Sequence, residues 1–158
     1  MIRGFTCSCF DLFHAGHVLM LKEAKDQCDY LIVGLQTDPT LDRPEKMKPI
    51  QSVYERFVQV TACKYVDEVL VYDTEKDLLD LIKSSRIDIR IVGEEYIDKD
   101  FTGRALGINL YFNKRTHDYS STELKKRIYT SFSKITIPSS AKLQELEESI
   151  NKIPKKGK

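Results

Sequence analysis

Short apolar runs alternate along the chain with longer segments in which apolar residues recur every three or four positions. The run from Tyr30 to Leu35 is apolar throughout, which is typical of a strand buried on both faces of a sheet. Between positions 16 and 27, by contrast, Val18, Leu21 and Ala24 share one face of a helix. This alternation predicts strands and helices that follow one another along the sequence.

The pattern predicts a parallel sheet with helices between its strands. Strands are expected at Ile2–Cys7, Tyr30–Leu35, Glu68–Tyr72, Ile87–Val92 and Ile108–Phe112. Helices are expected at Gly16–Gln27, Ser52–Cys63, Asp77–Ser84 and from Ser120 to about Tyr129, with a proline-containing loop at Thr37–Pro49. The predicted fold class is therefore α/β, a Rossmann-like parallel five-stranded sheet flanked by helices. Ligands bind beyond the carboxyl ends of such strands, so the loops there are the first place to look for a site.

Composition narrows the functional classes. The 158 residues suit one domain, and 25 basic against 24 acidic residues give a net charge of +1, so no nucleic-acid partner is expected. No apolar run approaches the roughly 20 residues of a membrane helix, and no membrane association is expected. The N-terminus lacks the apolar core of a signal peptide. The four cysteines are therefore expected to be reduced thiols in a cytoplasmic protein.

The loop after the first predicted strand carries two histidines that flank a glycine, and it leads directly into a helix. In the run His14-Ala15-Gly16-His17, the glycine permits a close approach of the backbone to a ligand. Free N–H groups at a helix start, reinforced by the helix dipole, attract anions. Imidazoles can donate hydrogen bonds to phosphate oxygens. The segment is a candidate cradle for a triphosphate.

Two other interpretations of these residues remain open. Each histidine could be an ordinary surface or capping residue. A zinc site could combine the histidines with Cys7 and Cys9, but structural zinc sites separate the paired cysteines by two to four residues and place about a dozen residues between the pairs. The whole set here is too closely spaced, so the phosphate cradle is favoured over zinc.

A second candidate anion site lies about a hundred residues further along the chain. Ser120 and Glu123 have the spacing of a capping box, which predicts another helix start with free N–H groups. Arg115 adds a planar guanidinium suited to phosphate oxygens. A capping box often does no more than start a helix, but all three histidines of the chain fall in these two segments. Two helix starts that face one pocket would suit a polyphosphate.

The run from Cys9 to His17, Cys-Phe-Asp-Leu-Phe-His-Ala-Gly-His, resembles the signature of the cytidylyltransferase-like nucleotidyltransferases, whose HxGH motif grips the nucleoside triphosphate. The same family has a second motif, which is similar to Arg115-Thr116 followed by Ser120-Ser121-Thr122. The resemblance extends through most of Met1 to Ile128. It is strongest to glycerol-3-phosphate cytidylyltransferases and to the catalytic domains of eukaryotic phosphoethanolamine enzymes.

The resemblance implies transfer of a cytidylyl group from CTP to a small phosphorylated alcohol, with glycerol 3-phosphate as the leading acceptor and Mg²⁺ as the cofactor. The acceptor's phosphate oxygen would attack the α-phosphorus in line and release pyrophosphate, without a covalent enzyme intermediate. Phosphoethanolamine, phosphocholine or another polyol phosphate are alternative acceptors, and ATP is an alternative nucleotide. A non-catalytic nucleotide sensor is the least favoured interpretation.

The resemblance also implies roles for individual residues. The expected catalytic residues are His14, His17, Lys46 and Arg115. The expected nucleotide-binding residues are Cys9, Phe10, Asp11, Gly16, Gly93, Glu94, Thr116, Ser120 and Ser121. Asp38, Lys48 and Arg56 are expected to bind the acceptor, and Asp11 to approach the metal. The lysines could instead be solvated loop charges, and Arg56 an ion-paired helix residue.

The chain departs from the family pattern at three places that bear on the choice of base and acceptor. Ser8-Cys9 replaces Gly-Thr, Asp118 replaces a glycine, and Glu94-Glu95 replace paired aspartates.

The C-terminal part lies outside the resemblance. The catalytic domain is expected at 1–130 and a helical extension at 131–158. Leu143, Leu146, Ile150 and Ile153 form a short heptad-like stripe that could fold back on the domain or contact a second copy. A homodimer is the expected assembly.

Overall fold

The structure, a computed structural model, describes residues 1–134 and residue 144. The elements occur in the order β1 (Arg3–Ser8), α1 (Ala15–Lys25), β2 (Tyr30–Gln36), α2 (Val53–Thr61), β3 (Glu68–Tyr72), α3 (Glu75–Ser84), β4 (Ile89–Gly93), β5 (Asn109–Asn113) and α4 (Ser121–Ser133). Short 3₁₀ helices lie at Pro39–Leu41 (η1), Glu94–Tyr96 (η2) and Arg104–Leu106 (η3). The predicted long loop therefore contains one turn of helix.

The chain divides into a compact unit, Met1–Glu123, and a second unit that begins at Leu124. The predicted domain boundary near residue 130 and the predicted extension stay predictions. The apolar stripe of Leu143, Leu146, Ile150 and Ile153 lies outside the described residues.

All five strands are parallel, in the order β3-β2-β1-β4-β5, which confirms the predicted fold class. The chain starts in the middle of the sheet, extends to one edge, and then returns to the other side of β1. Strand β1 pairs with β2 along its whole length, but with β4 only at Gly4–Ile89 and Phe5–Arg90. The carboxyl ends of β1 and β4 are thus not paired with each other at the topological switch point, where ligands of such sheets bind.

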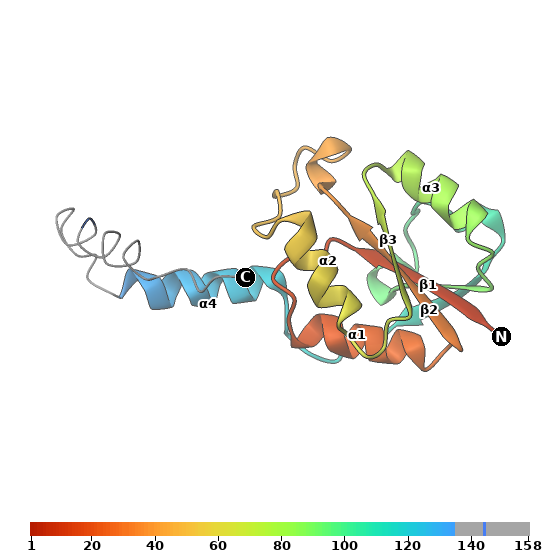
Figure 1. Cartoon of the computed structure of the whole chain (residues 1–158), viewed down its shortest axis with the longest axis horizontal. Helices are drawn as coiled ribbons and strands as arrows, with labels where there is room; N and C mark the ends of the chain where they lie inside the picture. Colours follow the sequence, from red (N-terminus) through yellow and green to blue (C-terminus); the bar gives the residue numbers. More distant parts are fainter. Residues whose placement is uncertain (135–143, 145–158) are drawn as a thin grey trace, which may run out of the picture. The chain divides into compact units, whose positions relative to one another are not determined.

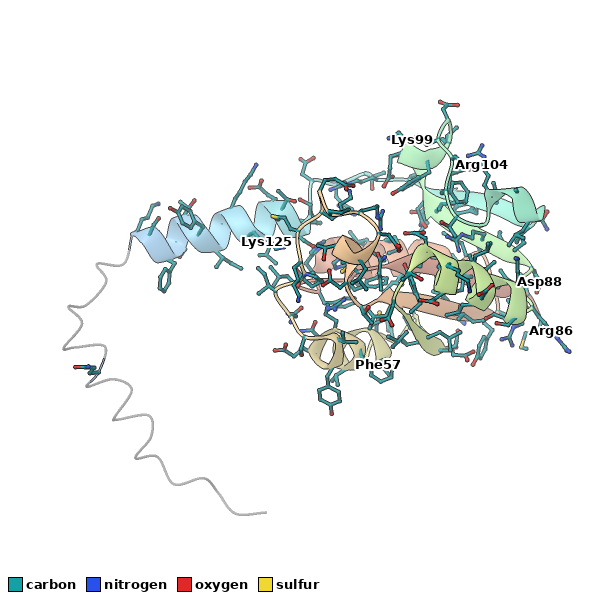
Figure 2. The ribbon with its side chains drawn as sticks, turned by 90° about the horizontal axis from the view of Figure 1, so that it is seen from above. Phe57, Arg86, Asp88, Lys99, Arg104 and Lys125 are labelled. Atoms are coloured by element: carbon teal, nitrogen blue, oxygen red, sulfur yellow. The ribbon has the colours of Figure 1, made fainter. Side chains whose placement is uncertain are left out.

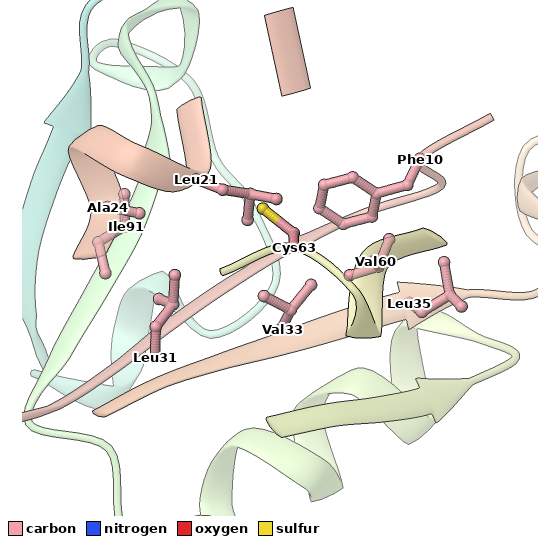
Figure 3. Close-up of a cluster of buried hydrophobic side chains, with 9 residues drawn as sticks. All are labelled: Phe10, Leu21, Ala24, Leu31, Val33, Leu35, Val60, Cys63 and Ile91. Atoms are coloured by element: carbon pink, nitrogen blue, oxygen red, sulfur yellow. The ribbon is translucent and has the colours of Figure 1, made fainter. Parts of the chain in front are cut away.

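Helices cover both faces of the sheet: α1 and α2 lie on one face and α3 on the other (Figure 1). On the first face, Leu21 and Ala24 of α1 and Val60 of α2 pack against Leu31 and Val33 of β2 (Figure 3). On the other face, Leu78 and Ile82 of α3 pack against side chains of β1, β2 and β3. The apolar run of β2 is buried from both sides, as its sequence predicts.

Polar residues just outside the apolar pattern fix where two helices begin. Ser52 and Glu55 form a capping box at the start of α2, and Thr74 and Asp77 form one at the start of α3. Helix α3 begins two residues earlier than predicted, because its first apolar position comes only after the cap and the first turn.

The four cysteines form no disulfide with one another. Within the described part of the chain, the helices are too short or too polar to cross a lipid bilayer.

Candidate active site

The loop after β1 delivers two stacked imidazoles to the start of α1. His14 is the N-cap residue, and its Nδ1 atom accepts a hydrogen bond from the Gly16 N–H at 3.1 Å. The His14 N–H in turn donates to Nδ1 of His17 at 3.3 Å, so the two histidines form a capping box. Their ring centroids lie 3.9 Å apart. Because each Nδ1 accepts a hydrogen bond, each neutral ring carries its proton on Nε2, where it can be donated.

Burial keeps His17 uncharged. Desolvation and the neighbouring His14 lower the pKa of His17 from 6.5 to about 3, although Asp11 acts in the opposite direction. At neutral pH His17 is therefore a hydrogen-bond donor through Nε2–H and not a cation. A neutral donor stabilises an anion without first needing a proton from solvent.

The start of α4 lies against the start of α1. Ser121 Oγ donates to the Asp11 carbonyl oxygen at 2.8 Å and lies 3.3 Å from Nε2 of His14. A methyl group at Gly16 would lie only 2.9 Å from the carbonyl oxygen of Tyr119 and 3.0 Å from Cε1 of His117. Two segments about a hundred residues apart in sequence are thus in contact, and the glycine makes that contact possible.

A cavity of about 260 Å³, here called the small cavity, opens between these segments. The predicted residues that line it are His14, Gly16, His17, Gly93, Arg115, Ser120 and Ser121. Ser120 also caps α4, because its Oγ accepts a hydrogen bond from the Glu123 N–H at 3.1 Å. This arrangement brings the two predicted helix starts to one pocket.

The loop that carries Arg115 is held by hydrogen bonds on both sides. The backbone N–H of Arg115 donates to Glu94 Oε1 at 2.8 Å, and its Nη2 donates to the Tyr119 carbonyl oxygen at 3.3 Å. Glu94, Thr116 and Asp118 line neither cavity described here. Glu94 therefore positions the loop, whereas its neighbour Glu95 lies over Gly93 inside the site.

A second cavity of about 530 Å³, the large cavity, lies toward α3. It shares Ser8, Met20, Gly93, Glu95 and Asn113 with the small cavity, so the two cavities meet at the carboxyl ends of β1, β4 and β5. Cys9 and Lys46 line the large cavity, and their roles stay predictions. The combined space follows the carboxyl edge of the sheet across its switch point.

Arg56 does not reach either cavity, although it was expected to bind the acceptor. Its side chain is 1% exposed, and its guanidinium donates to the carbonyl oxygens of Cys9 (2.8 Å), Gln36 (2.6 Å) and Thr37 (2.6 Å). Arg56 therefore ties together the chain segments that leave β1 and β2.

The other predicted acceptor residues also lie outside the cavities. Lys48 is 78% exposed and pairs with Asp38 at 3.7 Å. Asp38 caps η1 by accepting hydrogen bonds from Thr40. Their positions support a role in shaping the 37–50 loop and not in direct contact with the acceptor.

Phe10 and Asp11 hold the loop after β1 from beneath. Phe10 is 1% exposed, packs in the core between the sheet and helices α1 and α2 (Figure 3), and has a φ of +51°. Asp11 Oδ1 accepts hydrogen bonds from the N–H groups of Ile50 and Gln51, both at 3.0 Å. Neither side chain lines a cavity. Asp11 thus supports the backbone of the neighbouring loop through Oδ1, and its approach to Mg²⁺ stays a prediction.

Several residues that the sequence interpretation left out do line the site. His117 and Asn113 line the small cavity, and Arg43 and Arg90 line the large one. Two of them gave a signal in the sequence. His117 is one of three histidines that all fall in the two motif segments, and Arg90 is a charged residue in a short strand that the fold would bury on both faces.

The comparisons with known proteins agree with this geometry. A family model described as cytidylyltransferase-like matches residues 5–127. The chain belongs to the cytidylyltransferase-like family. Over 101 residues it is 40% identical to the bifunctional protein HldE of Caulobacter vibrioides, a match that covers 63% of this chain and 21% of the relative. Over 128 residues it is 35% identical to the ethanolamine-phosphate cytidylyltransferase of Dictyostelium discoideum, covering 75% of this chain and 35% of the relative.

A solved structure shares the fold of this family member. The lipopolysaccharide core biosynthesis protein from Thermoplasma volcanium GSS1 superposes with a TM-score of 0.59 at 28% sequence identity. The match covers 73% of this chain and 98% of that one. The curated relatives are much longer, and this chain corresponds to between a fifth and about a third of the two named above.

Proposed function

We propose that this chain transfers a cytidylyl group from CTP to a small phosphorylated alcohol and releases pyrophosphate, with glycerol 3-phosphate as the first acceptor to test. The observation that carries the proposal is the meeting of two helix starts and two imidazole Nε2–H donors at the small cavity, which opens into a larger one. A polyphosphate fits the first space and an acceptor the second.

In this proposal the triphosphate occupies the small cavity. His14 and His17 donate Nε2–H hydrogen bonds to its oxygens, with His17 nearest the α-phosphate, while the positive ends of the α1 and α4 helix dipoles attract the anion. Arg115, Ser120 and Ser121 hold the β- and γ-phosphates. These donors are in place before the reaction and stabilise the charge that develops on the α-phosphate oxygens.

The acceptor occupies the large cavity, with its phosphate at the junction where Ser8 and Gly93 line both spaces. Lys46 neutralises part of the charge that two phosphates bring together. The acceptor oxygen attacks the α-phosphorus, the bond to the β-phosphate bridging oxygen breaks, and pyrophosphate leaves. No side chain forms a covalent intermediate, so catalysis rests on positioning and electrostatics.

Mg²⁺ enters this scheme with the nucleotide as part of the substrate. Within the described residues, no group of three or more histidine, cysteine, aspartate or glutamate side chains could hold a metal ion. Mg²⁺ commonly binds through substrate phosphates and waters, with few protein ligands.

The choice of CTP is supported by the matching family and by the ethanolamine-phosphate cytidylyltransferase relative. ATP remains the second candidate nucleotide. A homodimer and a cytoplasmic location are kept as predictions from the sequence.

The test is a pyrophosphate-release assay of the purified chain with each of four nucleoside triphosphates, Mg²⁺ and a panel of phosphorylated alcohols. We expect turnover with CTP and at least one phosphorylated alcohol. Turnover with ATP alone would replace CTP by ATP. If no nucleotide supports turnover but one raises the melting temperature, the protein is a nucleotide sensor and the proposal fails.

A further inference from the structure

One charged residue in the large cavity is buried without a charged partner. Arg90 lies on β4, and successive side chains of a strand point to opposite faces of the sheet. Ile91 packs on the side of α1 and α2, so Arg90 lies on the α3 side, next to Phe5. Arg90 is only 2% exposed, yet it lines the large cavity. An arginine remains protonated in proteins, so this is a buried positive charge.

The contacts of Arg90 leave most of its donors unused. The guanidinium lies 5.1 Å from the ring centroid of Phe5 and 5.9 Å from that of Phe101. Nη2 donates to Sγ of Cys7 at 3.5 Å, and a thiol is a weak acceptor. Nε and Nη1 are buried and have no hydrogen-bond partner among residues 1–134.

Carboxylates also line the cavity, but none forms an ion pair with Arg90 within the described part of the chain. Glu75 is occupied by Arg43 at 3.3 Å and by the Thr102 hydroxyl at 2.5 Å. Glu95 lies over Gly93 where the two cavities meet, and Asp100 is an exposed residue of the same cavity lining. The charge of Arg90 is therefore not neutralised by a direct partner.

The surroundings of Arg90 contain further unpaired polar atoms. Burial, with further contributions from the Cys7 thiol and Glu75, raises the pKa of Tyr72 at the cavity wall, while Arg90 opposes the shift. Gln36 is 3% exposed and lines the cavity, and its Nε2 atom has no hydrogen-bond partner. A buried cation and a buried amide donor are thus available to the same ligand.

The loop above Arg90 is fixed in place. Arg104 donates to the carbonyl oxygens of Tyr96 at 3.0 Å, Lys99 at 2.7 Å and Ile97 at 3.0 Å, and Figure 2 shows Arg104 beside Lys99. Thr102 attaches the same loop to α3 through Glu75. Phe101 is held over the guanidinium, which makes the pocket a built feature of the fold.

We propose that the acceptor carries a second anionic group, a carboxylate, which binds Arg90 at the end of the large cavity remote from the transferred phosphate. This inference rests on the proposed function and names the class of acceptor as a phosphorylated hydroxy acid. The acceptor's phosphate lies at the junction of the two cavities, and its carbon chain extends toward Arg90, with Gln36 as a second donor.

The charge of the acceptor group that lies beside Arg90 distinguishes a phosphorylated hydroxy acid from a polyol phosphate or phosphoethanolamine. A buried guanidinium without an anionic partner destabilises the folded chain, and an anionic ligand offsets this through charge-assisted hydrogen bonds. The hydroxyls of a neutral polyol leave the charge uncompensated. The amine of phosphoethanolamine would place a second cation beside the first.

The test compares acceptors that differ only in a carboxylate replacing a CH₂OH group. D-3-phosphoglycerate is compared with sn-glycerol 1-phosphate, which has the same configuration, and 6-phosphogluconate with glucitol 6-phosphate, in kcat/KM and in direct binding by calorimetry. We expect the acid to be preferred by about 10- to 100-fold in at least one pair, the size of a hydrogen bond to a charged group. Replacing Arg90 with methionine should reduce that ratio by a similar factor.

The variants separate recognition from folding. Arg90→Met removes the charge at similar volume, and we expect a melting temperature at or above that of the natural chain. Arg3→Met, which changes an arginine that lines neither cavity, should keep the preference for the acid.

Equal or weaker binding of the acid in both pairs overturns the inference, as does a ratio that Arg90→Met leaves unchanged. If Arg90→Met does not fold, the preference of the natural chain decides alone. Failure of the proposed function has a different signature: no acceptor gives pyrophosphate with any nucleotide, while calorimetry still reports whether the acid binds.

Discussion

In each imidazole of the HxGH segment, one ring nitrogen belongs to the helix cap and the other carries the proton proposed to bind the ligand. In His14 and His17, Nδ1 accepts a backbone N–H within the α1 cap, so the neutral ring carries its proton on Nε2. Nε2 of His14 lies 3.3 Å from Ser121 Oγ. We predict that His17→Ala lowers kcat by about 10²- to 10³-fold, the range for loss of one fixed donor to a developing charge. His17→Gln, which can still present an N–H group, should recover part of the loss. Pyrophosphate release at saturating CTP measures both, and a kcat for His17→Ala within about threefold of the natural value would refute the role.

The lowered pKa of His17 also predicts how stability depends on pH. The folded chain binds a proton at His17 only near pH 3, whereas the unfolded chain binds one near pH 6.5. Between these values the unfolded state holds more protons, so the free energy of unfolding decreases as the pH falls, by up to about 1.4 kcal/mol per pH unit from this residue. Urea denaturation from pH 7 to pH 4 should show a steeper decrease for the natural chain than for His17→Gln. Equal slopes would contradict the assignment.

Arg56 gives a residue-scale prediction of the opposite kind, a loss of stability without a specific loss of acceptor binding. Arg56→Met leaves the carbonyl oxygens of Cys9, Gln36 and Thr37 without this donor, which should cost about 3 kcal/mol or more in the free energy of unfolding. The exposed Lys48→Met is the matched control and should change stability by less than about 0.5 kcal/mol. A raised acceptor KM with unchanged stability in Arg56→Met would restore the acceptor role expected from the sequence.

At the residue scale, the sequence predicted most of the residues that line the small cavity, because these residues lie at two helix starts and each helix start has a recognisable local motif. It did not distinguish residues that face the cavity from residues that support it. Phe10 and Asp11 belong to the same motif as His14, yet one is core and the other holds the backbone at Ile50 and Gln51. That difference depends on loop conformation, including the positive φ of Phe10, which a motif does not encode.

At the scale of elements, the approach of α1 to the loop before α4 depends on Gly16. Alanine normally favours a helix over glycine by about 1 kcal/mol. Here its methyl group would meet the Tyr119 carbonyl and the His117 ring. We therefore predict that Gly16→Ala weakens CTP binding by about 10-fold or more, measured by calorimetry.

The control for Gly16→Ala is Ala15→Gly, the reverse change at the exposed neighbouring position of the same turn. It should lower stability slightly and leave CTP affinity within about twofold. A Gly16→Ala protein that is more stable and binds CTP normally would show that the two segments do not depend on their close contact.

The strands and helices themselves were predictable because their periodicities are strong and their ends carry caps. The segment from residue 94 to 106 was not, because it has no periodicity: two short 3₁₀ helices and the hydrogen bonds of Arg104 to carbonyl oxygens organise it. This loop closes the large cavity, so the acceptor side of the site was less predictable than the nucleotide side.

At the scale of the whole molecule, the strand order of the sheet brings together loops that are far apart in the sequence. The order β3-β2-β1-β4-β5 places the loop after β1 beside the loops after β4 and β5. Alternating strands and helices predict a parallel sheet, but the pairing of β1 with β4 is a long-range contact that the pattern leaves open. The structure supplies that pairing.

The central claim is that one triphosphate contacts both segments of the small cavity. The chain has three histidines, His14, His17 and His117, and all three line that cavity, so histidine side-chain ¹⁵N resonances report on it without interference from elsewhere. On titration with CTP and Mg²⁺, the account predicts that the Nε2 resonances of His14 and His17 shift together with a resonance of His117, while His17 remains neutral. Histidine spectra that stay unchanged at a CTP concentration that supports turnover would contradict it.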